Sequence, residues 1–280
     1  MSAFRFLAFA AVAAMPLSLA AGAAPAAAVS AEAASALDAA LAGPWRSEAN
    51  RARDQYRHPK ETLAFFGLEP GMTVIEASPG SGWYTEVLAP VLKDKGHLIA
   101  AVNNPAASDN AKQAWDRYAA WTAERRQQFG NVTLAEFGKG VTKPLAAPGT
   151  VDLVVTFRNS HDWRNGGFDE EAYRAFYAAL KPGGVLGIVD HRLPENREET
   201  EATRRSSYVK ESSVIAAAEK AGFRLDSKSE VNANPKDSAD WPGGVFTLPP
   251  TLRLGDEDRA KYMAIGESDR MTLRFVKPAS

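Results

Sequence analysis

From residue 72 onward the chain alternates short runs of β-branched residues with longer stretches of helical periodicity. This alternation is typical of an α/β fold, in which helices connect parallel strands and cover both faces of the sheet. No internal repeat interrupts the pattern, so the sequence predicts one folded domain. The expected strands are 72–75, 97–102, 132–137, 151–157, 185–189, 223–231 and 271–276, and the expected helices are 83–92, 111–129, 169–180 and 208–221.

The composition supports such a core and narrows the chemistry. Of 280 residues, 45% are hydrophobic and 24% are charged, which excludes a disordered or fibrous chain. The formal net charge is -1, so no overall basic field attracts nucleic acid, although this leaves room for a local basic patch. The absence of cysteine excludes disulfides, thiolate metal sites and a thiol nucleophile. Histidine, tyrosine and carboxylates remain as the available bases.

Residues 1–28 have the pattern of a secretory signal peptide. Arg5 precedes an apolar run over 6–15, and small residues suited to cleavage follow at 21–23 and 26–28. The run is shorter than the roughly 20 residues that span a bilayer. We therefore expect a periplasmic or secreted protein with no stable membrane insertion after cleavage. Residues 29–55 would be an N-terminal helical or linker segment, and 56–280 the folded domain.

A glycine-rich turn follows the first expected strand, within the stretch Val74-Ile-Glu-Ala-Ser-Pro-Gly-Ser-Gly-Trp-Tyr-Thr85. Small residues let the backbone approach a ligand, and the N-terminus of the following helix offers free N–H groups. A phosphate-binding P-loop would need Gly-Lys-Ser/Thr, but here Trp83 follows Gly82. The dinucleotide pattern G-x-G-x-x-G fails at Thr85.

The turn agrees better with the S-adenosylmethionine (SAM) loop E/D-x-G-x-G-x-G. Glu76, Gly80 and Gly82 match it, and Ser78 replaces its first glycine. Together with the turn at 180–184, Leu-Lys-Pro-Gly-Gly, this loop makes residues 56–277 resemble the class I SAM-dependent methyltransferases. The fuller pattern Pro-Gly-x-Gly-Trp-Tyr-Thr, with Phe-Arg-Asn-x-His-Asp-Trp over 157–163, is similar to a bacterial group of exported predicted methyltransferases.

The resemblance implies a fold, a cofactor and a set of binding residues. The fold would be a Rossmann-like, seven-stranded sheet, mostly parallel with the last strand antiparallel, and with helices on both faces. The cofactor would be SAM. Asn103 or Asn104 would replace the acidic residue that usually binds the ribose, and the adenine would lie near Glu136, Phe137 and Gly138. The implied cofactor-binding residues are Glu76, Ser78, Pro79, Gly80, Ser81, Gly82, Trp83, Tyr84, Asn103, Phe157 and Asn159.

Candidate catalytic residues follow the fourth and fifth strands, because ligands of open α/β sheets bind beyond the carboxyl ends of the strands. They are His161, Asp190 and His191. A neutral histidine is a suitable base near pH 7; alternatively, both histidines only hydrogen-bond loop backbone. No metal site is expected, because no His-x-x-x-His or Glu-x-x-His spacing is present. Asn159 is not followed by Pro-Pro, so nucleobase or glutamine methylation is not supported.

The segment 232–270 is a long connection between the last two expected strands. Connections of this length are usually functional or carry small elements of their own. We expect a lid over the acceptor, with Trp241, Phe246 and Tyr262 as lining residues; the alternative is a surface excursion packed on the sheet edge.

The sequence therefore predicts a SAM-dependent methyltransferase that modifies an unidentified small molecule. The alternative is an exported ligand-binding protein with the methyltransferase fold and no transferase activity. Two observations favour that alternative: SAM is made in the cytoplasm, and Ser78 and Asn103 depart from the usual pattern. An NAD-linked oxidoreductase is disfavoured by the loop spacing. The sequence does not predict the oligomeric state.

Overall fold

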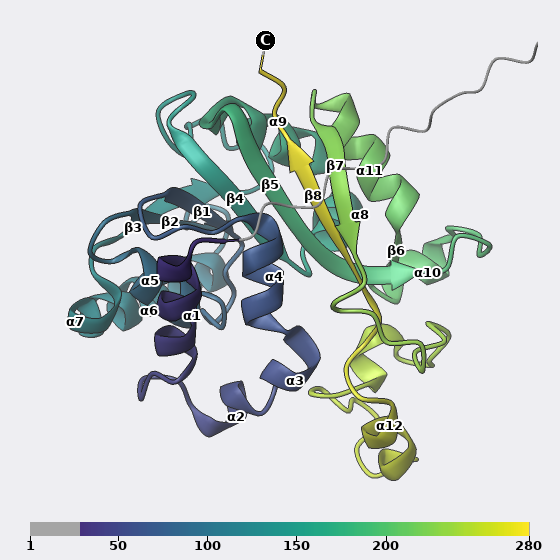
Figure 1. Ribbon diagram of the computed structural model, residues 1–280. Coiled ribbons are helices and arrows are strands. Elements are labelled where there is room, and N and C mark those ends of the chain that lie inside the picture. Colours follow the sequence, from purple (N-terminus) through teal and green to yellow (C-terminus); the bar gives the residue numbers. More distant parts are fainter. Residues whose placement is uncertain (1–28, 280) are drawn as a thin grey trace, which may run out of the picture.

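The computed structural model describes residues 29–279, and the predicted signal peptide lies outside this range. A twisted sheet crosses the molecule, with helices on both of its faces (Figure 1). Its strands lie in the order β3-β2-β1-β4-β5-β8-β7, and a short strand, β6, pairs with the end of β5. The strands are β1 (Thr73–Ala77), β2 (His97–Asn103), β3 (Val132–Phe137), β4 (Val151–Phe157), β5 (Leu180–Leu193), β6 (Val209–Lys210), β7 (Arg224–Ser229) and β8 (Arg270–Val276).

The direction of the strands confirms the expected topology. Strands β1 to β5 pair in parallel along the sheet, whereas β8 is antiparallel to both β5 and β7. The carboxyl ends of the first five strands therefore meet at one edge, which is where ligands of such sheets bind. The two-residue strand β6 was not expected, because a run this short has no recognisable alternation.

Two sets of helices sandwich the sheet because its buried strands are apolar on both faces. Helices α1, α4, α5 and α7 pack on the face that carries Val74, Leu98 and Val155. Helices α8, α9 and α11 pack on the face that carries Ile75 and Val154. The helices are α1 (Ala31–Leu41), α2 (Glu48–Arg51), α3 (Asp54–Arg57), α4 (Pro59–Phe66), α5 (Thr85–Leu92), α6 (Asp109–Glu124), α7 (Arg126–Phe129), α8 (Ser160–Gly166), α9 (Asp169–Ala179), α10 (Glu201–Arg205), α11 (Glu211–Lys220) and α12 (Arg259–Ile265).

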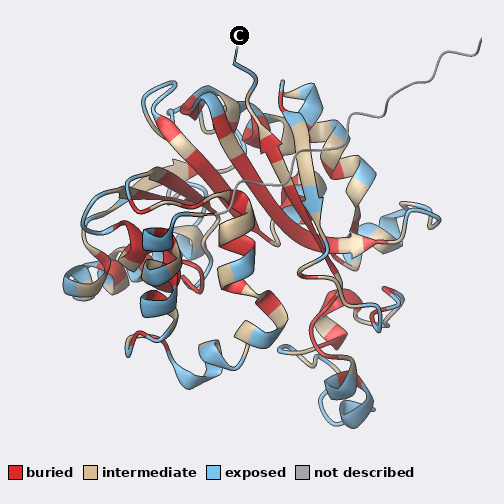
Figure 2. Ribbon diagram, viewed as in Figure 1, coloured by how far each residue is buried: buried red, intermediate tan, exposed pale blue. Residues whose placement is uncertain are grey.

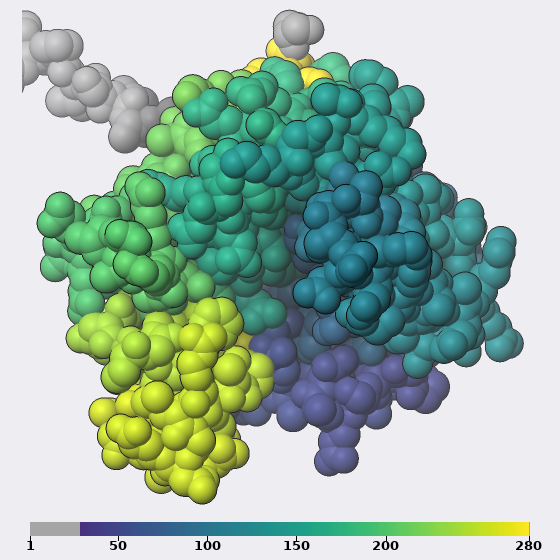
Figure 3. All heavy atoms as spheres, turned by 180° about the vertical axis from the view of Figure 1, so that it is seen from behind, coloured from purple at the N-terminus to yellow at the C-terminus, as the bar shows by residue number. Residues whose placement is uncertain are grey.

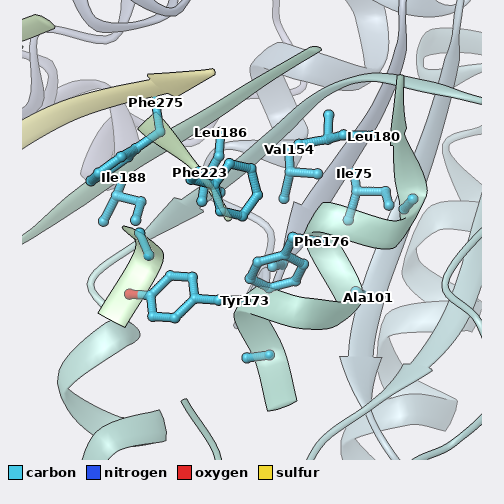
Figure 4. Close-up of a cluster of buried hydrophobic side chains, with 14 of the residues drawn as sticks. Ile75, Ala101, Val154, Tyr173, Phe176, Leu180, Leu186, Ile188, Phe223 and Phe275 are labelled. Carbon is cyan, nitrogen blue, oxygen red and sulfur yellow. The ribbon is translucent and has the colours of Figure 1, made fainter. Parts of the chain in front are cut away.

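The core follows from strand alternation and helical periodicity. Figure 4 shows Ile75, Val154 and Ile188 of the sheet gathered near the rings of Tyr173 and Phe176 from α9. Figure 2 shows the same central strands as mostly buried. This packing fixes the carboxyl ends of the strands, and so places the loops that follow them.

The N-terminal segment packs on the body of the protein. The indole Nε1 of Trp45 donates a hydrogen bond to the Glu86 carbonyl at 2.8 Å, and the buried Arg46 guanidinium pairs with Asp54 at 2.7 Å. Pro59 begins α4, where its missing N–H costs nothing, and Gly67 ends the helix in the left-handed conformation. Residues 31–57 thus contain three helices, of which α1 packs against α5.

Several element boundaries differ from expectation. The helix expected over 111–129 is interrupted at Arg125, between α6 and α7, and the helix expected from 208 begins at Glu211. The turn over 181–184 is a bulge inside β5: Leu180 lies opposite Val151, and Val185 opposite Leu153. The connection 232–270 contains α12 and a 3-10 helix, Gly244–Thr247. Among the described residues, no helix is both long and apolar enough to cross a membrane.

Candidate functional site

A pocket of about 530 Å³ opens at the carboxyl ends of β1, β2, β3 and β4. This volume is typical of small-molecule sites. In Figure 3 it is part of the hollow between the blue surface of residues near 100–115 and the teal-green surface beside it. Its lining residues are Ser78, Pro79, Gly80, Val102, Asn103, Asn104, Ala107, Ser108, Ala111, Ala114, Phe137, Gly138, Lys139, Asn159, Asp162, Trp163 and Phe168.

The glycine-rich turn forms one wall of this pocket, and its two glycines serve different purposes. Gly80 has a φ of +60°, and a Cβ added there would meet nothing within 4 Å, so its face is open to the pocket. At Gly82, with a φ of +84°, a Cβ would lie 2.5 Å from the Trp121 ring. Gly80 therefore leaves space for a ligand, whereas Gly82 allows α6 to pack closely. Ser78 also has a positive φ, +54°, at a position where the SAM loop has glycine.

Asn159 holds this turn in place. Its Nδ2 donates to the Ala77 carbonyl at 3.2 Å, to the Ser78 carbonyl at 3.3 Å and to Thr156 Oγ1 at 3.0 Å. The side chain at the end of β4 thus ties the end of β1 to the loop that follows it. Asn159 has a positioning role as well as a place in the pocket wall.

The opposite wall comes from β2, β3 and α6. Asn103, Asn104, Phe137 and Gly138 line the pocket, as expected for the ribose and adenine ends of SAM. Glu136 does not; it lies outside the pocket and pairs with Lys143 at 3.2 Å. The sequence analysis missed the α6 wall formed by Ser108, Ala111 and Ala114. The signal was present, because small residues spaced by three share one face of a helix.

Glu76 is buried directly beneath the turn. Its Oε2 accepts a hydrogen bond from Thr85 Oγ1 at 2.6 Å, and that hydroxyl lies 2.8 Å from the Tyr118 hydroxyl. Burial raises the pKa of Glu76 to about 8, and the bonds from Thr85 only partly oppose the effect. Within the described residues no basic side chain pairs with this carboxyl group.

The other residues expected to bind the cofactor lie outside the pocket lining. Ser81 is exposed, whereas the side chains of Trp83 and Tyr84 turn toward the N-terminal segment. Trp83 donates to the Asn50 carbonyl at 3.1 Å, and the Tyr84 ring stacks on Phe157. These residues begin α5, and the helix turns their side chains into the face that α3 and the end of β4 cover. Glu76, Gly82 and Phe157 likewise do not line the pocket.

The three expected catalytic residues come together in a buried cluster. The Asp190 carboxylate accepts from the His161 amide at 3.0 Å and lies 2.7 Å from His161 Nδ1. His191 Nδ1 lies 2.5 Å from Ser268 Oγ, and the two imidazole rings are 5.3 Å apart. The cluster does not itself line the pocket, but Asp162 and Trp163, adjacent to His161, do.

The two histidines differ in their proton affinity. Burial alone would lower the pKa of His161, but the charge and hydrogen bond of Asp190 outweigh it and raise this pKa above its usual value. Burial, together with the positive charge of His161 and of nearby arginines, places the pKa of His191 well below its usual value. His161 is therefore the histidine of the pair that can accept a proton near neutral pH.

The same three residues have a spacing that a metal ion would accept. One ligand atom from each of His161, Asp190 and His191 lies within 4.8 Å of the others. Hydrogen bonds to Asp190 and Ser268 already engage both Nδ1 atoms.

The aromatic residues expected to line a lid lie elsewhere. Trp241 and Phe246 pack near Leu193 and Tyr208, and Trp241 meets Tyr262 edge to face. None of these three aromatic residues of the connection lines the main pocket. The physical reason is a buried carboxylate, Asp237, which accepts hydrogen bonds from the Tyr208 hydroxyl, the Trp241 indole and two backbone amides, and so holds the connection against the end of β5.

Comparisons with known proteins support the fold. No protein-family model and no curated protein sequence matches the chain. Among solved structures, a SAM dependent methyltransferase from Aquifex aeolicus matches at 18% identity with a TM-score of 0.51, over 81% of this chain and 93% of its own. The [4+2]-cyclase SpnF matches at 14% identity with a TM-score of 0.56, over 89% and 94%.

A third solved structure is a geranyl diphosphate C-methyltransferase from Streptomyces coelicolor A3(2) in complex with Mg²⁺, geranyl diphosphate and S-adenosyl-L-homocysteine. It matches at 12% identity with a TM-score of 0.53, over 85% of this chain and 87% of its own. The chain thus has the Rossmann-like fold of class I SAM-dependent methyltransferases. The cyclase among its neighbours illustrates that the fold alone does not fix the reaction.

Proposed function

We propose that the protein is a SAM-dependent methyltransferase that acts on a small molecule. The observation that carries this proposal is the pocket at the ends of β1, β2 and β3, with the Ser78–Gly80 turn as one wall. Its position agrees with the SAM site that the sequence resemblance implies. The similarity to SAM-dependent methyltransferases in fold supports the same cofactor.

The residues of the pocket fit SAM. Gly80 leaves open space where a side chain would intrude, and Asn103 and Asn104 offer amides for the ribose hydroxyls. Phe137 and Gly138 would hold the adenine. When bound, SAM supplies an electrophilic methyl group, so the protein mainly needs to orient the acceptor and remove a proton from it.

His161 is the proposed base for an oxygen or nitrogen acceptor. When His161 Nδ1 donates to Asp190, Nε2 carries the free lone pair and can accept a proton. Asp190 also stabilises the charged imidazolium that results, which is why it raises the pKa of His161. His191 lacks this support, so we assign it a packing role beside the base.

Calorimetry with SAM and S-adenosylhomocysteine tests the proposal, with NADH as a negative control. We expect both sulfur compounds to bind the wild-type protein and to bind Gly80→Val at least tenfold more weakly. Gly183→Val is the matched control, because Gly183 also has a positive φ and open space around it but lies on the bulge of β5, outside the pocket. No binding at millimolar cofactor would contradict the proposal and favour a ligand-binding role.

The acceptor can be sought by incubating the protein with labelled SAM and a metabolite extract. Label should appear in one or a few small molecules, and His161→Ala should lower the rate by about 10²–10⁴-fold. A His161→Ala rate equal to wild type would remove His161 from the reaction.

We also propose that the protein is exported, on the pattern of residues 1–28. Fractionation of cells that express the tagged full-length chain should recover a shortened product outside the cytoplasm. An uncleaved, wholly cytoplasmic product would contradict export without affecting the proposed activity.

A further inference from the structure

A group of four arginines lies beside the histidine cluster, and we call it the arginine cluster. Arg53 and Arg57 come from the start and end of α3, Arg158 follows β4, and Arg270 begins β8. They surround one acidic residue, Glu267, in the loop before β8. Arg57, Arg270 and Glu267 are 2–3% exposed, so solvent hardly screens their charges.

The single negative charge of Glu267 does not balance the positive charges of this cluster. Its carboxylate lies 2.5 Å from Arg53 Nε and 3.6 Å from Arg57 Nε, and it accepts a hydrogen bond from Arg270. Arg158 has no acidic partner in the part of the chain that the structure describes. Four positive charges therefore face one negative charge. Buried nitrogens without a hydrogen-bond partner are Arg53 Nη2, Arg57 Nε, Arg57 Nη2, Arg158 Nε and Arg270 Nε.

Buried charge of one sign is unfavourable unless something compensates it. Burial and the charge of Arg158 lower the pKa of Arg57 to about 8, and burial with the other arginines lowers that of Arg158 to about 10. A guanidinium keeps its proton under ordinary conditions. The lowered pKa values of Arg57 and Arg158 therefore indicate an excess of positive charge, which a bound anion would neutralise.

The cluster borders a small cavity of about 10 Å³, which is room for one water-sized group. Arg57, Arg158 and Arg270 line it together with Asn232, whose Oδ1 also lacks a hydrogen-bond partner. The remaining wall comes from Tyr84 and from the last residues of β4 and β5, Phe157 and Val189. The cavity is thus at the carboxyl edge of the sheet, where a ligand is expected.

Arg158, which lines this cavity, directly precedes a residue that lines the main pocket. Its φ of +66° is unusual for a residue other than glycine, and its amide donates to the Val189 carbonyl at 2.7 Å. The next residue, Asn159, lines the main pocket, and His161 lies two residues further on. Backbone strain of this kind is often retained where it positions a functional side chain.

We propose that the arginine cluster binds an oxyanion, a carboxylate or a phosphate, on the methyl acceptor. This inference rests on the proposed methyltransferase function, and it requires the arginine side chains to move apart around the oxyanion, because the cavity of about 10 Å³ holds only a water-sized group. Guanidinium groups pair with either oxyanion through two parallel hydrogen bonds. The acceptor is then a small anionic molecule whose reacting atom lies toward His161 and the main pocket.

Anion binding to the full chain tests this directly. Thermal unfolding is followed in inorganic phosphate, acetate and chloride at equal ionic strength. Phosphate or acetate should raise the Tm saturably by about 2–4 °C relative to chloride. A larger shift with phosphate identifies a phosphorylated acceptor, and a larger shift with acetate identifies a carboxylic acid.

Variants link the shift to the cluster. Arg158→Gln removes the arginine without an acidic partner and should weaken anion binding at least tenfold. Arg205→Gln is the matched control, because Arg205 is exposed on α10 and pairs with Glu201; it should keep the wild-type shift. The proposal would be overturned if the oxyanions raised the Tm of wild type and Arg158→Gln equally. It would also be overturned if phosphate and acetate raised the wild-type Tm no more than chloride does.

Two further measurements keep the test decisive. If Arg158→Gln does not fold by circular dichroism, Arg158→Lys replaces it: the proposal expects intermediate anion affinity, and wild-type affinity overturns it. SAM calorimetry on the same variants separates the two proposals, since Arg158→Gln should change SAM affinity less than twofold. Phosphate binding without SAM binding would reject the methyltransferase function but retain the anion site.

Discussion

The carboxyl edge of the sheet holds two regions of opposite character. At β1, β2 and β3 the pocket is lined mainly by small and uncharged residues, and the Glu76 carboxyl group beneath the glycine-rich turn keeps its proton near neutral pH because burial raises its pKa to about 8. At β4, β5 and β8 the arginine cluster has an excess of positive charge. The first region suits the cationic end of SAM and the second an anionic acceptor. The two halves of the proposed site thus differ in charge: the cofactor half is nearly uncharged, and the acceptor half is positively charged.

The largest expected effect tests the positive region. Glu267→Gln leaves the arginine cluster, in which Arg57 and Arg270 are buried, without an acid and should lower the free energy of unfolding by about 3–5 kcal/mol. Urea unfolding at pH 7 measures the change. Glu201→Gln removes an exposed carboxylate from a surface pair and should cost less than about 1 kcal/mol. Equal effects would mean that Glu267 does not neutralise the cluster.

The lowered pKa of Glu267 predicts how the stability of the protein falls in acid. Burial alone would raise the pKa of Glu267, but the arginines outweigh it and lower the pKa to about 2, from the ordinary 4.5. Its contribution, about 3 kcal/mol, is therefore present above pH 4.5 and is lost as the pH falls from 4.5 through 2. The stabilities of wild type and Glu267→Gln should converge over this range. A constant difference between them would contradict the assignment.

Glu76 should behave in the opposite way. Burial raises the pKa of Glu76 to about 8. The stability that the protonated Glu76 side chain contributes is therefore fully present below pH 4.5 and is lost as the pH rises through 8. Glu76→Gln should stabilise the free protein by about 2–3 kcal/mol at pH 7, and yet weaken SAM binding about tenfold. SAM affinity of the wild type should increase with pH up to about 8, whereas that of the variant should not. A flat wild-type profile would remove Glu76 from cofactor binding.

The two glycines of the turn separate stability from binding. Gly82→Ala forces a Cβ against Trp121 and should destabilise the fold by about 2 kcal/mol. Gly80→Ala meets no neighbour and should cost only about 1 kcal/mol from its backbone conformation, but it should lower SAM affinity more than Gly82→Ala does. Denaturant unfolding and calorimetry on both variants measure the contrast. If Gly80→Ala were the less stable variant and Gly82→Ala lost more SAM affinity, then Gly82, and not Gly80, would face the ligand.

The smallest effect concerns Ser78. Its φ of +54° strains a serine, so Ser78→Gly should raise the free energy of unfolding by about 0.5–1 kcal/mol. The gain is limited because the contact from Trp163 Nε1 to Ser78 Oγ, at 3.4 Å, is lost. A loss of stability greater than 1 kcal/mol would show that this contact matters more than the strain.

The first region could be predicted from the sequence because its signals are local. The turn from Ser78 to Gly80 lies within one short stretch between a strand and a helix, and alternation places Asn103 and Phe137 at the ends of neighbouring strands. The alternation of strands and helices predicted the parallel strands, whereas the antiparallel last strand was implied by the resemblance to class I methyltransferases. The prediction failed for Trp83 and Tyr84, because periodicity shows that a residue is on a helix but not which neighbour covers it.

The second region could not be predicted because its residues are distant in sequence. Arg53 and Glu267 are separated by 214 positions, and nothing near either residue indicates the other. The three candidate catalytic residues were found because His161 follows β4 and Asp190 and His191 lie near the carboxyl end of β5, but no sequence pattern singles out the arginines beside them. Near-neutral net charge hid the cluster, since a sum over 280 residues does not report where charges are concentrated.

The distance between Arg53 and Glu267 also sets an order of assembly. A chain made from its N-terminus exposes Arg53, Arg57 and Arg158 long before Glu267, the acid that pairs with Arg53 and Arg57, is synthesised. Until Glu267 arrives, these arginines repel one another and favour hydrated, open segments. The sheet from β1 to β5 can be completed earlier, so the half of the site at β1 to β3 would form first, and the closing of α3 onto the start of β8 would be among the last steps of folding.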